Sequence, residues 1–102
     1  MTLYTVGIWV VKPGHEDAFV RAWREMADWT MREVVGETAE GQGGKLLRDR
    51  EEPHRFISFG PWESLEAIEA WRAQPGFQDR VRRMQEMLEQ LTPMTLDDVS
   101  AQ

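Results

Sequence analysis

The run from Leu3 to Val11 constrains the fold most, because it is apolar on both sides of an extended chain. Its β-branched and aromatic residues predict a strand, which Pro13-Gly14 ends. Alternation places Tyr4, Val6, Ile8 and Val10 on one face and Leu3, Trp9 and Val11 on the other. Since both faces need cover, the rest of the chain or a partner must supply a layer on each side.

Six further elements follow, each identified by the period of its apolar residues. They are a helix over 15–34, strands over 45–50 and 54–62, helices over 64–73 and 77–91, and a strand over 94–99. Glycines predict a loop between Gly36 and Gly44, and Pro93 is expected to end the last helix. The order β-α-β-β-α-α-β predicts a single α+β ferredoxin-like domain over 1–102. Its four-stranded antiparallel sheet would carry the helices on one face.

The sheet face without helices would expose the second apolar side of the first strand. An exposed apolar patch of that kind marks an interface, so we expect a homodimer through the sheet face. The alternative is that the C-terminal segment folds back over this face. The segment after Leu91 is short for that task.

Composition excludes several classes of protein. A net charge of −6 argues against nucleic acid and against an anionic membrane surface. No apolar run approaches the roughly 20 residues of a membrane span, and no signal peptide is apparent. The chain has no cysteine, which fits a cytoplasmic protein. Neither His15 nor His54 has metal-ligand spacing, so we expect no metal site.

Four segments together resemble the antibiotic biosynthesis monooxygenase (ABM) domains. They are Lys12–Phe19, Lys45–Asp49, Phe59–Ser64 and Ala70–Arg72. The resemblance covers essentially the whole chain and implies a dimeric α/β barrel. The superfamily includes cofactor-independent, quinone-forming monooxygenases and haem-degrading monooxygenases, so the fold alone does not define the chemistry.

The resemblance implies three catalytic candidates. Trp62 is similar to the strand-three tryptophan of the enzymes, where an indole can stack on a flat substrate. Ser58 stands where the anthrone-oxidising members carry an asparagine, and it can donate a hydrogen bond to a carbonyl. Arg82 is the nearest match to their helical arginine, a cation for a phenolate or oxyanion. Trp62 is equally a candidate core residue, and Arg82 can instead pair with Glu86 on the helix surface.

A ligand pocket is predicted beside these residues. Alternation puts Phe56, Ser58, Gly60 and Trp62 on one face of their strand and Gly7 with Trp9 on one face of the neighbouring strand. Small residues among aromatics leave room for a ligand, although a bulge or tight packing also explains such glycines. Haem-degrading members carry an asparagine where Gly7 stands and a histidine on the last helix. This chain has neither, which argues against haem degradation.

Two functions of different classes remain. One is a cofactor-independent monooxygenase acting on a small aromatic or polycyclic phenolic substrate, whose deprotonated form supplies the electron to oxygen. The other is a non-catalytic dimeric module that binds a small hydrophobic ligand or serves a neighbouring enzyme. The convergence of Ser58, Trp62 and Arg82 on one cavity would favour the first.

Overall fold

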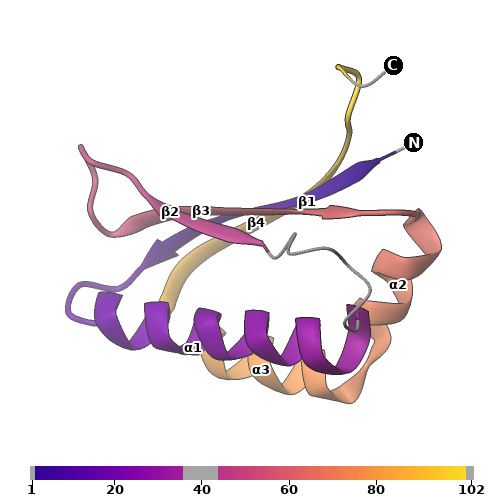
Figure 1. The fold of residues 1–102 in the computed structure, drawn as a ribbon. Helices are drawn as coiled ribbons and strands as arrows, with labels where there is room; N and C mark the ends of the chain where they lie inside the picture. Colours follow the sequence, from indigo (N-terminus) through magenta and orange to yellow (C-terminus); the bar gives the residue numbers. More distant parts are fainter. Residues whose placement is uncertain (1, 36–43, 101–102) are drawn as a thin grey trace.

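A computed structural model describes residues 2–35 and 44–100 as a sheet with helices packed on one of its faces (Figure 1). The elements are β1 (Leu3–Val11), α1 (Glu16–Trp29), η1 (Thr30–Val35), β2 (Lys45–Arg48), β3 (Arg55–Trp62), α2 (Leu65–Ala73), α3 (Pro75–Gln85) and β4 (Leu88–Asp97). Most of the predicted glycine loop, residues 36–43, lies outside the described residues.

The sheet confirms the predicted fold class. Its strand order is β2-β3-β1-β4, and every neighbouring pair is antiparallel. β1 lies beside β3, with Gly7 opposite Ser58 and Thr5 opposite Gly60. The two halves of the predicted hairpin, β2 and β3, pair from Lys45↔Phe59 to Arg48↔Phe56. The helix-facing sides of β1 and β3 are therefore fixed relative to each other.

The first helix changes type before its end. α1 buries Phe19, Trp23, Met26 and Trp29 as its period predicts, but residues Thr30–Val35 form a π-helix where an α-helix was expected. At the junction the Thr30 hydroxyl donates to the Met26 carbonyl oxygen at 2.8 Å. Such back-bonding competes with the regular backbone ladder, and π turns recur at functional sites.

The C-terminal part corrects one prediction. α2 begins as expected, with the Ala67 amide donating to the Ser64 hydroxyl at 3.1 Å. α3, however, ends at Gln85, and the predicted helix as far as Leu91 is wrong because β4 already begins at Leu88. Pairing with β1 holds this segment extended from Leu88 to Asp97. Pro93 lies within β4 because an edge strand tolerates a missing N–H on its unpaired side.

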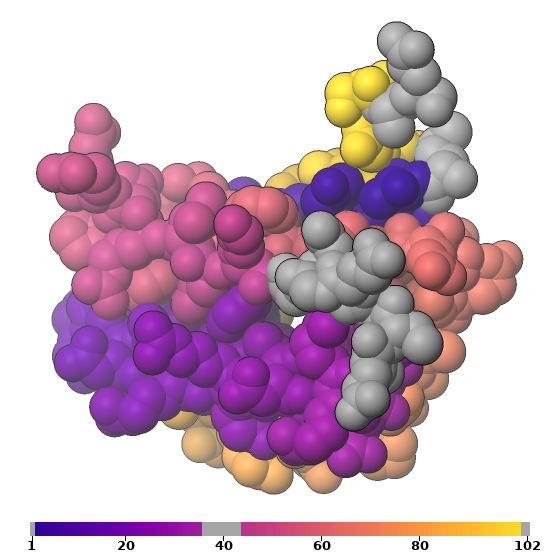
Figure 2. Space-filling model, in the orientation of Figure 1, coloured from indigo at the N-terminus to yellow at the C-terminus, as the bar shows by residue number. Residues whose placement is uncertain are grey.

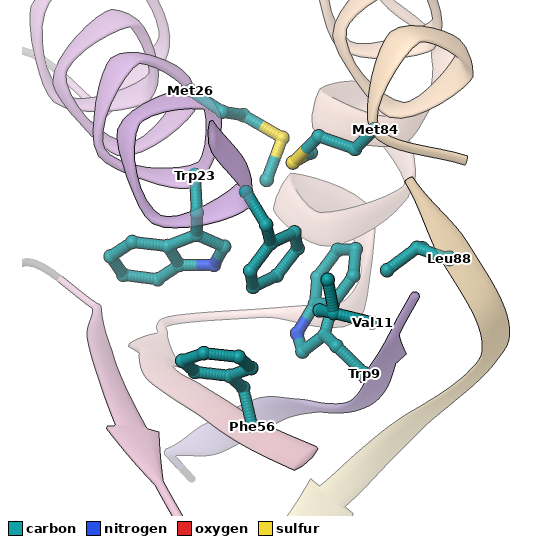
Figure 3. Packing of buried hydrophobic residues seen from close by; sticks show 8 residues of the cluster. Trp9, Val11, Trp23, Met26, Phe56, Met84 and Leu88 are labelled. Atoms are coloured by element: carbon teal, nitrogen blue, oxygen red, sulfur yellow. The ribbon is translucent and has the colours of Figure 1, made fainter. Parts of the chain in front are cut away.

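The core fills one end of the space between sheet and helices. Val11, Phe19, Phe56 and Met84 are at most 1% exposed. The Phe19 ring lies 5.3 Å from Trp9 and 5.2 Å from Phe56. Figure 3 shows the rings of Trp9, Trp23 and Phe56 between α1 and the strands, with the side chains of Met26 and Met84 meeting above them.

The opposite sheet face carries no helix (Figure 1). The turn between β2 and β3 and the segment after β4 rise on either side of it, which gives the outline a saddle shape (Figure 2). Leu47 and Leu96 are 52% and 46% exposed at the two edge strands. Within 2–35 and 44–100, every helix falls short of the length and apolarity that crossing a bilayer requires.

Candidate active site

A cavity of about 1000 Å³ lies between the sheet and the helices, at the end of the molecule where β1 begins. The helix-facing positions of β1 and β3 form its floor, and helices α1, α2 and α3 with η1 contribute its walls. This volume suits a small organic ligand, and the lining is mainly apolar with a few polar groups.

Three aromatic rings make one wall of the cavity. The Trp62 ring centroid lies 4.8 Å from that of Trp71, with 35° between the planes. Trp71 in turn meets Phe77 edge-on at 4.5 Å. Trp62 therefore lines the cavity, and its partners come from α2 and α3. The wall offers flat apolar surface against which an aromatic ligand can stack.

The floor holds two indole–hydroxyl hydrogen bonds. The Trp9 Nε1–H donates to Ser58 Oγ at 2.9 Å, and the Trp62 Nε1–H donates to Thr5 Oγ1 at 3.1 Å. Ser58 is only 9% exposed. The cavity is lined by Ser58, Trp9 and Trp62, as the sequence predicted. The polar atoms of all three, however, already form hydrogen bonds between β1 and β3.

Both predicted glycines line the cavity, and both are also sites of close packing. A Cβ on Gly7 would lie 2.8 Å from Trp9 Nε1 and 3.1 Å from Ser58 Oγ. A Cβ on Gly60 would lie 3.1 Å from the backbone of Gly44. Room for a ligand and tight packing therefore both explain these glycines. The missing side chains leave space above the floor and also permit the Trp9–Ser58 hydrogen bond.

Arg82 does not lie with the other two catalytic candidates, so the predicted convergence is wrong for this residue. Its side chain is 71% exposed and pairs with Asp79 at 2.9 Å, rather than with Glu86. The reason is the phase of α3. Phe77, Val81 and Met84 take the inward stripe, which leaves Asp79 and Arg82, three residues apart, on the outer surface.

Phe56 belongs to the core and does not line the cavity. It is 1% exposed, with Phe19 at 5.2 Å and the Arg48 guanidinium 5.0 Å from its ring centroid. It shares the helix-facing side of β3 with Ser58, as alternation predicted, but at the other end of the strand. The prediction of the strand face on which Phe56 lies is confirmed, but the prediction that Phe56 lines the ligand cavity is wrong.

Sequence reasoning missed the charged residues of the cavity. Within the described parts of the chain, Arg72 and Glu63 are the charged residues that line it, and no described residue forms an ion pair with Arg72. Arg72 follows Trp71 directly in the motif that carried the family resemblance, and that adjacency was the available signal. Over 2–35 and 44–100, no three His, Cys, Asp or Glu side chains are grouped so that they could hold a metal ion.

Comparison with known proteins assigns the chain to a family. The model of the antibiotic biosynthesis monooxygenase family matches residues 3–83. The chain belongs to this family. A solved structure described as an antibiotic biosynthesis monooxygenase is similar to this ABM chain, with a TM-score of 0.77 and 22% identity over 95% of this chain and 98% of that one. No protein with a curated description matches.

Two further structures share the ABM fold. SnoaB from Streptomyces nogalater, a cofactor-independent oxygenase solved as an asparagine-to-alanine variant, aligns with a TM-score of 0.82 and 18% identity, over 98% of this chain and 95% of that one. A conserved protein from Methanosarcina mazei aligns with a TM-score of 0.81 and 15% identity, over 96% and 93%. At these identities the likeness establishes the fold.

Proposed function

We propose that this ABM protein is a cofactor-independent monooxygenase that acts on a small aromatic or polycyclic phenolic substrate. The observation that carries the proposal is the cavity of about 1000 Å³ with the Trp62–Trp71–Phe77 wall on one side and hydroxyl groups on its floor. Family membership and the similarity to a cofactor-independent oxygenase support the reaction class.

The proposed reaction needs little from the protein beyond binding and charge stabilisation. A methylene flanked by aromatic rings, as in an anthrone, loses a proton, and the resulting anion transfers an electron to O₂. One oxygen atom becomes the product carbonyl, and the other leaves as water with the two methylene hydrogens. The substrate supplies all the electrons, so the site has to orient the ring and stabilise its anion.

Arg72 is the cation that we propose for this stabilisation, in place of Arg82. It lines the cavity, is half-buried, and has no ion-pair partner among the described residues. A guanidinium beside a partly dry cavity favours the phenolate or enolate form of a bound ligand. Trp62 would stack on the ring, and Ser58 would face the oxygen substituents.

One observation favours a second function, a non-catalytic module that binds a small ligand. Ser58 occupies the position where the resemblance implies an asparagine, and its oxygen already accepts a hydrogen bond from Trp9. Glu63, the carboxylate that lines the cavity, is exposed. A site with these groups holds a ligand through stacking and hydrogen bonds even if it does not turn the ligand over.

Oxygen uptake with an anthrone distinguishes the two functions. We expect turnover by the wild type, a loss of about tenfold or more in kcat/KM for Trp62→Phe and Arg72→Gln, and no change for the matched control Arg82→Gln, whose side chain is outside the cavity. Binding without turnover across a panel of anthrones would favour the non-catalytic module. Equal loss for both arginine variants would contradict the assignment of Arg72.

We also propose that the protein is cytoplasmic, which the absence of cysteine in the sequence supports.

We further propose that two copies of the chain associate through the sheet face that carries no helix. The side chains on this face are those of Tyr4, Val6, Ile8, Ile57, Phe59 and Leu96. A second copy can cover such a self-complementary apolar patch. Light scattering after size exclusion should give twice the monomer mass for the wild type and the monomer mass for Ile57→Glu. A monomeric wild type at micromolar concentration would contradict the dimer.

A further inference from the structure

Three indole–hydroxyl pairs line the cavity, and they are not equivalent. The Trp71 Nε1–H donates a hydrogen bond to Thr30 Oγ1 at 3.0 Å, and the Thr30 hydroxyl donates a hydrogen bond to the Met26 carbonyl oxygen at 2.8 Å. This pair is complete, because each of its hydrogens has an acceptor within the protein. Its hydroxyl has no hydrogen left to offer a ligand.

The other two pairs stop at the hydroxyl. Ser58 and Thr5 each accept an indole N–H, at 2.9 and 3.1 Å, and among the described residues neither hydroxyl hydrogen has an acceptor. A hydroxyl has one hydrogen to donate and two lone pairs to accept with. The indole N–H occupies one lone pair of each oxygen, so each hydroxyl keeps one lone pair and its hydrogen. That hydrogen is the group that can be donated to a ligand.

Both open-ended hydroxyls are on the cavity floor. Thr5 lies opposite Gly60 and Ser58 opposite Gly7, so the two hydroxyl residues are diagonal neighbours on adjacent strands, with two glycines completing the square. No side chain from either glycine stands beside them, and both hydroxyl residues line the cavity. The space above the floor is therefore where an acceptor for the two hydrogens can be placed.

Donation by the indoles also strengthens these hydroxyls as donors. In a chain of hydrogen bonds each bond polarises the next, and the effect is larger in a site of low dielectric constant. Ser58 is 9% exposed, so this condition holds at its position. Trp9 and Trp62 are then positioning residues, which fix the oxygen of each hydroxyl and direct its hydrogen away from the indole.

We infer that the floor recognises acceptor oxygens on the ligand through the Ser58 and Thr5 hydroxyls, which selects carbonyl, phenolate or enolate compounds over hydrocarbons of the same shape. The inference rests on the proposed ligand site and names its substrate class more closely. Where the resemblance implies an asparagine amide in the anthrone-oxidising members, this floor carries two hydroxyls on neighbouring strands, each held by a tryptophan. Charge that builds on a substrate oxygen would meet both donors.

A matched pair of probes tests the inference, with tryptophan fluorescence as the readout. We expect 9,10-anthraquinone to bind the wild type at least tenfold more tightly than anthracene, which has the same ring system without oxygens. Ser58→Ala and Thr5→Val should each weaken anthraquinone binding about five- to tenfold and leave anthracene binding unchanged. Anthracene is thus the control within each variant for an intact cavity.

The outcomes separate this inference from the proposed function. If both probes bind the wild type equally, or if the two variants lose both probes equally, the cavity remains a ligand site and the hydroxyl recognition is wrong. If neither probe binds, the ligand site itself is wrong. A positioning role for Trp9 has its own readout: Trp9→Phe should raise the apparent pKa of a bound hydroxyanthraquinone, which its absorption spectrum reports, while anthracene binding persists.

Discussion

The two ends of the space between sheet and helices have similar aromatic content and opposite packing. At the end where β1 finishes, Val11, Phe19, Phe56 and Met84 are at most 1% exposed. At the end where β1 begins, the rings of Trp62, Trp71 and Phe77 stand around a cavity of about 1000 Å³. Figure 1 places the first end beside the start of α1 and the second beside α2.

The difference comes from the sheet and not from the helices. The packed end has Val11 and Phe56 on the floor, whereas the cavity end has Thr5, Gly7, Ser58 and Gly60 in the same strands. Large floor residues meet the helices and exclude space, and small ones leave it. Trp9 lies at the boundary, because its ring packs on Phe19 while its N–H joins the Ser58 hydroxyl.

The largest effect is expected at the packed end. Phe19→Ala removes a ring that is 0% exposed and leaves a void that its neighbours cannot fill. We expect it to lower the free energy of unfolding by about 3–5 kcal/mol, measured by chemical denaturation. A loss below about 1.5 kcal/mol would mean that the packed end also contains free space, and the comparison would fail.

The boundary is tested by Gly7→Ala. The added Cβ would lie 2.8 Å from Trp9 Nε1, so the Trp9–Ser58 hydrogen bond has to break or shift. We expect a loss of about 1–3 kcal/mol in stability, together with at least tenfold weaker anthraquinone binding. Denaturation and fluorescence titration measure the two effects.

Gly14→Ala is the matched control for that variant. Gly14 has φ of +88° and nothing within 4 Å of the added Cβ, so alanine there is strained without touching the cavity. It should lower stability by about 1 kcal/mol and leave anthraquinone binding unchanged. If Gly7→Ala also leaves anthraquinone binding unchanged, the glycine is not required for the arrangement of Trp9 and Ser58 on the cavity floor.

A cavity-end ring should matter less for stability than Phe19 does. Trp71→Phe keeps an aromatic ring beside Trp62 but removes the N–H that Thr30 accepts at 3.0 Å. Thr30 retains its own bond to the Met26 carbonyl oxygen. We expect a loss of about 1 kcal/mol by denaturation. A loss as large as that of Phe19→Ala would show that the cavity wall is packed like the core.

The fold followed from the sequence where a local pattern and the tertiary contacts agree. Alternation in 3–11 predicted both faces of β1, and the stripe of α1 predicted the buried residues Phe19 and Met26. The pattern failed at Leu88, an apolar residue that continues the helical period but is held extended by pairing with β1. Leu88 pairs with Val11, which is far from it in the sequence, and a short stretch of sequence around Leu88 carries no sign of that pairing.

The site was predictable in its floor and not in its charges. Strand alternation correctly predicted the residues of the floor, because it determines which side chains share a face. The residues that line the cavity in this way are Gly7, Trp9, Ser58, Gly60 and Trp62. The resemblance alone points to Arg82, and the inward stripe of α3 leaves this residue on the outer surface. Thr5 shares a face with Gly7, but its hydrogen bond to Trp62 needs the β1–β3 register, which one sequence does not supply.

The smallest effect concerns the turn between β2 and β3, which directly precedes the packed-end residue Phe56 in the chain. Backbone N–H groups of Glu51 and Glu52 donate to the Asp49 carboxylate at 2.8 and 3.3 Å, and Arg55 pairs with it at 3.1 Å. The Glu51 amide is the largest cause that lowers the pKa of Asp49 below its ordinary 3.8, and partial desolvation opposes the shift. A lowered pKa adds stability that is present above pH 3.8 and is lost as the pH falls through the lowered value.

Asp49→Asn tests whether this turn supports the packed end. An asparagine oxygen still accepts from the two amides, so the variant removes mainly the charge that faces Arg55. We expect a slightly lower Tm than that of the wild type at neutral pH, a gap that closes as the pH falls below 3.8 through the lowered pKa of Asp49, and unchanged anthraquinone binding at the far end of the sheet. Asp49→Ala, which also removes the acceptor, should widen the gap at neutral pH. A gap that stays constant with pH would contradict the contribution of the charge, and weakened ligand binding would show that the two ends are coupled.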